Sequence, residues 1–237
     1  MARRLKAVTL TLLFIQGDNV MAETTQAGGI PRIGDIAPDF TANTTEGPIK
    51  FSEWKGDKWA VLFSHPADFT PVCSTELTEF AKRKKEFEEL NVKLIGLSVD
   101  SIHSHLAWRE NLAKIMGVEL NFPMIADLDT KVSQKFGMLH PGESETLTIR
   151  AVFVIDPANK VRALIYYPLN VGRNVDEVKR LVTALQTTDK NKVACPVNWK
   201  PGDKVIVPPP KTVADVAERK SHKDYESFDF YLNKKSL

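Results

Sequence analysis

Apolar and polar residues follow one another along the chain in blocks that predict alternating strands and helices. Short apolar runs, which are typical of buried strands, occupy residues 59–64, 92–99, 122–126, 151–155 and 161–166. Segments with apolar residues at helical spacing cover about 74–90, 101–116, 129–137 and 174–186. Ser101 and Asn174 are favourable N-cap residues, and Gly117 is favourable just beyond a helix end. The alternation predicts an α/β fold with a largely parallel central sheet.

The last fifty residues depart from this pattern. Proline becomes frequent after residue 187, at positions 196, 201, 208, 209 and 210. Proline fixes the backbone and removes a hydrogen-bond donor, so this composition predicts an extended arm. A small appended segment follows the arm and completes a C-terminal part at 188–237.

The first 28 residues form an N-terminal extension. A basic start precedes an apolar stretch, Ala7–Ile15, that is too short to span a bilayer. The extension fits a secretory signal or an organelle presequence, and it also fits an addition in front of a natural start at Met21. We expect a cytoplasmic protein, or a periplasmic, secreted or organellar one if residues 1–22 are a targeting peptide.

Composition and charge are those of an ordinary globular protein. Hydrophobic residues make up 43% and charged residues 26% of the chain, and the net charge is +2. Such a small charge gives no reason to expect a nucleic-acid partner. No stretch predicts stable membrane insertion.

Cys73 is the strongest candidate for chemistry. It follows the apolar strand at 59–64 and a proline-containing turn, and it stands where the long helix begins. The unpaired N–H groups and positive dipole end of a helix N-terminus favour the thiolate form. Thr70 stands three residues earlier, so its hydroxyl can reach the sulfur or an oxygen bound there. The alternative is that Cys73 is a small buried hydrophobic residue.

The pattern Pro-x-x-x-Thr-x-x-Cys, formed by Pro66, Thr70 and Cys73, resembles the peroxiredoxin family. The fuller string H-P-A-D-F-T-P-V-C-S-T-E-L is similar to its 1-Cys subgroup. Segments at 34–40, 148–157 and 167–174 extend the resemblance to about residues 29–230.

The resemblance implies a thioredoxin-like peroxidase domain at 29–187 and a dimerisation segment within 188–237. It implies reduction of hydrogen peroxide and organic hydroperoxides through a cysteine sulfenic acid, in antioxidant defence, without a cofactor or metal. A homodimer or higher oligomer is expected.

The resemblance also implies roles for individual residues. Cys73 is the peroxidatic nucleophile and Arg150 is the guanidinium that holds sulfur and peroxide together. Thr70 orients the peroxide and Pro66 shields the oxidised sulfur from water. Supporting candidates are Arg173, which would orient Arg150, and His65. A surface ion pair for Arg150 and a hydrogen bond in the core for His65 are the alternatives.

Cys195 departs from the 1-Cys pattern. The string V-A-C-P-V-N-W-K-P-G around it resembles the segment that carries the resolving cysteine of 2-Cys peroxiredoxins. By this resemblance, Cys195 of one subunit would form a disulfide with Cys73 of another. The alternative is an incidental cysteine, with the sulfenic acid reduced by an external thiol from a thioredoxin-like protein or glutathione.

Other functions fit the sequence less well. A dithiol oxidoreductase would need Cys-x-x-Cys, but Glu76 occupies the position three after Cys73. His103 and His105 have no partners at the spacing of a metal site. An oligomeric holdase chaperone is the remaining alternative, and its function would survive Cys73→Ser.

Overall fold

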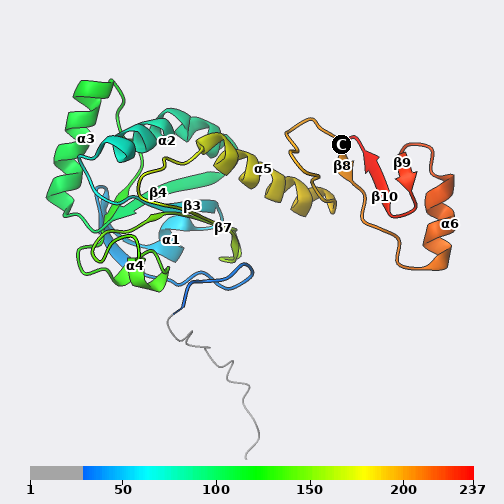
Figure 1. Ribbon diagram of the computed structural model, residues 1–237, viewed down its shortest axis with the longest axis horizontal. Helices are drawn as coiled ribbons and strands as arrows, with labels where there is room; N and C mark the ends of the chain where they lie inside the picture. The colour runs from blue at the N-terminus through cyan, green and yellow to red at the C-terminus, as the bar shows by residue number, and fades with distance from the viewer. Residues whose placement is uncertain (1–28) are drawn as a thin grey trace, which may run out of the picture.

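A computed structural model describes residues 29–237, and the predictions made for residues 1–28 lie outside them. The main body is a seven-stranded sheet in the order β2-β1-β5-β4-β3-β6-β7 with helices on both faces (Figure 1). Its strands are β1 Thr41–Thr44, β2 Gly47–Lys50, β3 Trp59–Ser64, β4 Val92–Ser98, β5 Met124–Ala126, β6 Arg150–Ile155 and β7 Val161–Tyr167. Its helices are α1 Phe51–Lys55, α2 Pro71–Glu89, α3 Ile102–Met116, α4 Lys131–Lys135 and α5 Val175–Asn191.

The central sheet is mixed, so the prediction of a largely parallel sheet is wrong. Only the β3–β4 and β4–β5 pairs are parallel. β6 pairs antiparallel with both β3 and β7, and β1 pairs antiparallel with β2 and β5. The β6–β7 and β1–β2 connections are short turns, with Asn159 and Gly47 at positive φ, and a strand that turns back directly must run antiparallel. The α/β class itself is confirmed.

β3 lies at the centre and is buried along its whole length. Val61 and Phe63 face a cluster built with side chains of α2, α3 and α5. Ala60 and Leu62 face the opposite cluster, to which α1 and α4 contribute. Because both faces of β3 are covered, its sequence is a continuous apolar run rather than an alternating one.

All four predicted helices are present, but α5 continues five residues beyond its predicted end and α2 begins earlier than predicted. α2 begins at Pro71, three residues before the predicted start, with Thr70 as its N-cap residue. Pro71 suits the first helical position because its missing N–H would have no partner there. Ser101 and Asn174 cap α3 and α5 through their side chains, as predicted.

The C-terminal part contains a small folded unit. After α5 the chain forms a three-stranded sheet, β8-β10-β9, and projects away from the main body (Figure 1). The elements are β8 Val205–Ile206, α6 Val213–Ser221, β9 Glu226–Asp229 and β10 Leu232–Lys235. Large apolar side chains remain exposed on this unit, including Val213, Phe228, Phe230 and Tyr231.

Within residues 29–237, no helix is long and apolar enough to cross a membrane.

Candidate active site

The loop from β3 to α2 carries Cys73 into the first turn of α2. The first i→i−4 hydrogen bond at this end runs from Ser74 N to Thr70 O, at 3.0 Å. The N–H of Cys73 therefore precedes the regular bonds of the helix and belongs to its positive end. The side chain is fully buried and belongs to the same hydrophobic cluster as Phe63 and Leu77.

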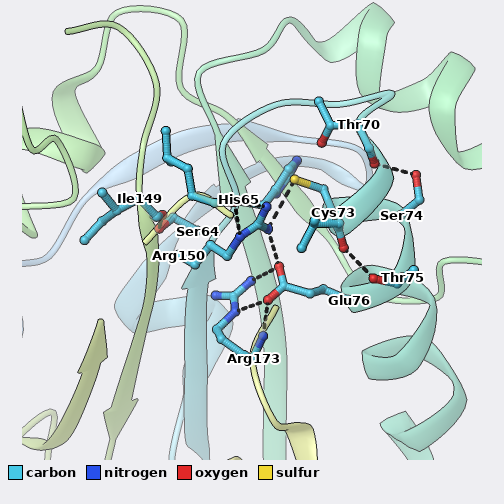
Figure 2. A network of polar contacts seen from close by, with 12 residues as sticks. Ser64, His65, Thr70, Cys73, Ser74, Thr75, Glu76, Ile149, Arg150 and Arg173 are labelled. Carbon is cyan, nitrogen blue, oxygen red and sulfur yellow. Dashed lines mark hydrogen bonds and ion pairs between the residues drawn. The ribbon is translucent and has the colours of Figure 1, made fainter. Parts of the chain in front are cut away.

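Arg150, the first residue of β6, lies against the sulfur. Its Nη1 donates to Cys73 Sγ at 3.4 Å and to Glu76 Oε2 at 2.6 Å (Figure 2). Its Nε and Nη2 both donate to the carbonyl of Leu169, at 3.0 and 2.7 Å. The guanidinium is thus fixed at both ends, and it is buried. The antiparallel pairing of β6 with β3 brings this residue beside the helix N-terminus.

Glu76 and Arg173 complete the network, and the part played by Glu76 was missed from the sequence. Arg173 donates to Glu76 Oε1 through its backbone N at 2.7 Å and Nε at 2.8 Å, and to Oε2 through Nη2 at 2.9 Å (Figure 2). Its Nη1 donates to the carbonyl of Ala151 at 2.8 Å. Glu76 therefore links the two arginines. Its spacing of three from Cys73, which places both on one face of a helix, was the available signal.

The charges of this network have a clear balance. Burial would raise the pKa of Glu76, but the charge and hydrogen bonds of Arg173 and the charge of Arg150 outweigh it and hold the pKa below its ordinary value. Glu76 is thus an anion, and two cations share it. The net positive charge that remains lies beside the sulfur of Cys73.

Thr70 and Pro66 lie in the same loop. The Thr70 hydroxyl donates to the carbonyl of Ala67 at 2.8 Å, so its proton is directed into the loop and not at the sulfur. Its oxygen keeps lone pairs that can accept a hydrogen bond. Pro66 is buried directly after β3.

His65 belongs to a second buried polar group, with Asp68 and His105. His65 Nε2 lies 2.9 Å from Asp68 Oδ1, and His105 Nδ1 lies 2.7 Å from Asp68 Oδ2. One ligand atom from each residue lies within 4.8 Å of the others, so this is the one group in the described chain with the composition of a metal site. His65 Nε2 and His105 Nδ1 each lie at hydrogen-bond length from an oxygen of Asp68. Such distances indicate side chains that are joined by hydrogen bonds rather than ligands arranged around a metal ion.

Comparisons with known proteins identify the family of the chain. The sequence model of the AhpC/TSA family matches residues 33–164, and that of the C-terminal domain of 1-Cys peroxiredoxin matches residues 184–222. The chain belongs to the peroxiredoxin family. Its similarity to the 1-Cys subgroup places it there, and it is a thiol-dependent peroxidase with a thioredoxin-like fold.

Relatives match over most of their length. Peroxiredoxin 2 of Caldanaerobacter subterraneus is 53% identical over 204 residues, which cover 86% of this chain and 92% of the relative. The peroxiredoxin of Aquifex aeolicus is 51% identical, covering 88% and 98%. Among solved structures, the yeast mitochondrial 1-Cys peroxiredoxin superposes with a TM-score of 0.79 at 43% identity, covering 88% of this chain and all of the other. Peroxiredoxin 6 of Arenicola marina gives 0.78 at 39% identity, covering 88% and 98%.

Cys195, the second cysteine of this peroxiredoxin, follows α5 and lies apart from the network around Cys73. It is half-buried, and its Sγ lies 3.8 Å from the carbonyl of Ala184. It packs against a small cluster that includes Val193, Trp199 and Val205. Burial raises the pKa of the Cys195 thiol, and the charge of Arg180 offsets this only in part. Both cysteines are free thiols.

Proposed function

We propose that Cys73 is the peroxidatic cysteine of this enzyme. The observation that carries the proposal is the contact between a buried sulfur at a helix N-terminus and Arg150 Nη1, at 3.4 Å. The Cys73 thiolate attacks one peroxide oxygen, so that an S–O bond forms and the O–O bond breaks. Cysteine is oxidised to sulfenic acid, and the peroxide is reduced to water or an alcohol once the departing oxygen takes up a proton.

Arg150 is the group that stabilises the departing oxygen in this proposal. It is a donor only, and the Leu169 carbonyl and the Glu76 carboxylate fix its plane before substrate binds. A donor that needs no reorganisation contributes more to a developing anion than a mobile one does. Arg173 acts through Glu76 to hold Arg150. Thr70 contributes the acceptor side of its hydroxyl to the peroxide, and Pro66 limits access of water.

The sulfenic acid on Cys73 must then be reduced, and in this proposal a second copy of the chain takes part in that step. The C-terminal unit that follows Cys195 projects from the main body (Figure 1). Its aromatic side chains Phe228, Phe230 and Tyr231 are exposed. Such a patch favours a protein partner, and a homodimer or higher homo-oligomer provides one. Cys195 of one subunit would attack the sulfenic sulfur of Cys73 in the other, forming a disulfide and releasing water.

An external thiol provides the reducing electrons in either cycle. The structure of the yeast relative is described as resolving its thiol through glutathione and thioredoxin systems. We infer that a thioredoxin-like protein or glutathione serves here as well, in antioxidant defence in the cytoplasm. If Cys73 and Cys195 form an intersubunit disulfide, the reductant opens that disulfide. If they do not, the reductant attacks the sulfenic acid on Cys73 directly.

The test compares two single variants in a peroxide-consumption assay with hydrogen peroxide and with an organic hydroperoxide. With dithiothreitol as reductant, Cys73→Ser loses turnover completely and Cys195→Ser retains it, because dithiothreitol can reduce the sulfenic acid itself. With thioredoxin as reductant, Cys195→Ser also loses turnover if the disulfide is the thioredoxin substrate. Turnover in Cys73→Ser would overturn the assignment, and undiminished thioredoxin-dependent turnover in Cys195→Ser would remove Cys195 from the cycle.

A further inference from the structure

The hydroxyl of Ser64 is a buried polar group that the proposed chemistry of Cys73 and Arg150 does not use. Ser64 is the last residue of β3, follows five residues without a polar side chain other than the indole of Trp59, and is fully buried. A buried hydroxyl is costly unless it is hydrogen-bonded, so its partners indicate what it does at this position.

The Ser64 hydroxyl joins two backbone groups that stand on either side of Arg150. Ser64 Oγ donates to the carbonyl of Ile149 at 2.5 Å (Figure 2). It accepts from the backbone N–H of Ala151 at 3.1 Å. A hydroxyl has one proton to donate and lone pairs that accept, so both hydrogen bonds can form at the same time. The side chain therefore bridges the residue before Arg150 and the residue after it.

This bridge stands where the main-chain pairing of β3 with β6 ends. The ladder runs as far as Phe63 and Val152, and the next pair in the same register would be Ser64 with Ala151. At this point β3 stays with its other neighbour, because its pairing with β4 continues to Ser64. Side chains satisfy the Ala151 backbone instead, since its N–H donates to Ser64 and its carbonyl accepts from Arg173 Nη1.

The backbone of Arg150 is consequently held on both edges of β6. On one edge Arg150 pairs with Tyr167 of β7. On the other edge, Ser64 holds the two residues beside Arg150. The place of the guanidinium depends on this backbone, and its Nη1 lies 3.4 Å from Cys73 Sγ. Because a misplacement of about 1 Å can lower a reaction rate by about a hundredfold, a small shift of the strand would affect the reaction.

We propose that Ser64 is a positioning residue, whose hydroxyl fixes the backbone at the start of β6 and so sets the place of the Arg150 guanidinium beside Cys73. In this role Ser64 acts through Arg150 and makes no contact with the peroxide. The inference rests on the proposed function of Cys73 and Arg150.

A double-mutant cycle of Ser64→Ala with Arg150→Lys tests whether Ser64 acts through Arg150. Stopped-flow measurement follows the oxidation of Cys73 by hydrogen peroxide, and circular dichroism confirms that each variant is folded. We expect Ser64→Ala to lower the rate about tenfold in the wild-type chain. In the Arg150→Lys chain the same change should lower the rate by less than about twofold, because the group that the bridge positions is already lost. Ser64→Thr keeps the hydroxyl and should retain most of the rate.

The matched control is Ser133→Ala. Ser133 is likewise fully buried, but its hydroxyl donates to the carboxylate of Asp127 and not to the backbone of β6. This variant also loses a hydroxyl from the interior, and we expect it to keep the wild-type rate of Cys73 oxidation.

Hydrogen exchange in the reduced, ¹⁵N-labelled protein tests the bridge without any reaction with peroxide. In wild type the Ala151 N–H should exchange slowly. In Ser64→Ala we expect this N–H and the Arg150 Nε–H, which donates to the Leu169 carbonyl, to exchange at least about fivefold faster. The Arg150→Lys variant assigns the Nε–H signal. If Ser64→Ala does not fold, wild type still decides, because an Ala151 N–H that exchanges like a solvent-exposed amide would remove the bridge.

Three further results would refute the proposal. A folded Ser64→Ala enzyme with the wild-type oxidation rate would remove the role of the hydroxyl. The same relative loss with and without Arg150→Lys would mean that Ser64 acts independently of Arg150. An equal loss in Ser133→Ala would mean that removing any buried hydroxyl has this effect. Failure of the proposed function would be seen separately, as turnover in Cys73→Ser, and it would leave the exchange results unchanged.

Discussion

Cys73 and Cys195 are both free thiols, but the polar groups around them differ. Cys73 receives a hydrogen bond from Arg150, which is itself fixed by Glu76 and the Leu169 carbonyl. Cys195 lies near one carbonyl oxygen, and burial raises the pKa of its thiol. Burial alone raises the pKa of a thiol and so makes it less reactive. A buried thiol becomes reactive only where donors and positive charge are built around it.

The largest expected effect comes from removing the anion that holds the two arginines. Glu76→Gln leaves two buried guanidinium groups without a carboxylate, so we expect the free energy of unfolding to fall by about 3–5 kcal/mol. The rate of Cys73 oxidation should fall as well, because Arg150 loses one of its fixed partners. Urea unfolding and stopped-flow oxidation measure the two effects.

The matched control for this variant is Glu79→Gln on the same helix. Glu79 is 39% exposed and pairs with Arg83, so its loss should cost no more than about 1 kcal/mol. Equal losses in the two variants would contradict the account of the network.

Arg150→Lys tests whether positive charge alone is sufficient to activate the sulfur of Cys73. A lysine keeps the positive charge, but its single ammonium cannot contact Cys73, Glu76 and the Leu169 carbonyl in one plane. We expect the rate constant for reaction with peroxide to fall about a hundredfold, with little change in folding. Arg162→Lys, a partly exposed arginine paired with Asp156 and Asp189, should leave the rate unchanged. A wild-type rate in Arg150→Lys would show that charge alone is sufficient.

Acid should lower the contribution that the network around Cys73 makes to the free energy of unfolding. The folded protein holds the pKa of Glu76 below its ordinary value of 4.5, so this carboxylate stabilises the fold above that pH. The stabilisation is lost as the pH falls below 4.5 and through the lower pKa that Glu76 has in the folded protein. We expect the free energy of unfolding to decline more steeply in wild type than in Glu76→Gln over this acid range. Parallel curves from urea unfolding at several pH values would exclude the linkage.

The smallest effect is expected around Cys195. Among residues 29–237, Arg180 is the cation whose charge lowers the pKa of the Cys195 thiol, and it is partly exposed and already paired with Glu177. Arg180→Gln should slow alkylation of Cys195 by iodoacetamide by no more than about threefold. A drop as large as that of Arg150→Lys would mean that Cys195 is activated by its surroundings.

The sequence was sufficient for features that depend on neighbouring residues. The strand before Cys73, the helix after it and the caps of α3 and α5 follow from local apolar spacing and from single capping residues. Pro66, Thr70 and Cys73 stand within eight residues of one another, so a motif can identify them.

Contacts between distant segments were harder to predict. Glu76 meets Arg150 and Arg173 from 74 and 97 residues away, and Asp68 meets His105 from 37 residues away. Nothing in the spacing of these residues specifies the pairing, because the sheet brings them together. The direction of β6 was missed because an apolar run predicts a buried strand but not whether its neighbours run parallel or antiparallel. Strands β8 to β10 were missed because they are short and carry no strong apolar pattern.

Peroxide oxidises Cys73 in the proposed reaction, and every other residue role depends on this step. The most direct test is the mass of the intact protein, with peptide mapping, after one equivalent of hydrogen peroxide and no reductant. The account predicts oxidation at Cys73, either as an added oxygen or as a disulfide with Cys195 that dithiothreitol removes, and no such change in Cys73→Ser. An unchanged mass, or oxidation confined to Cys195, would contradict it.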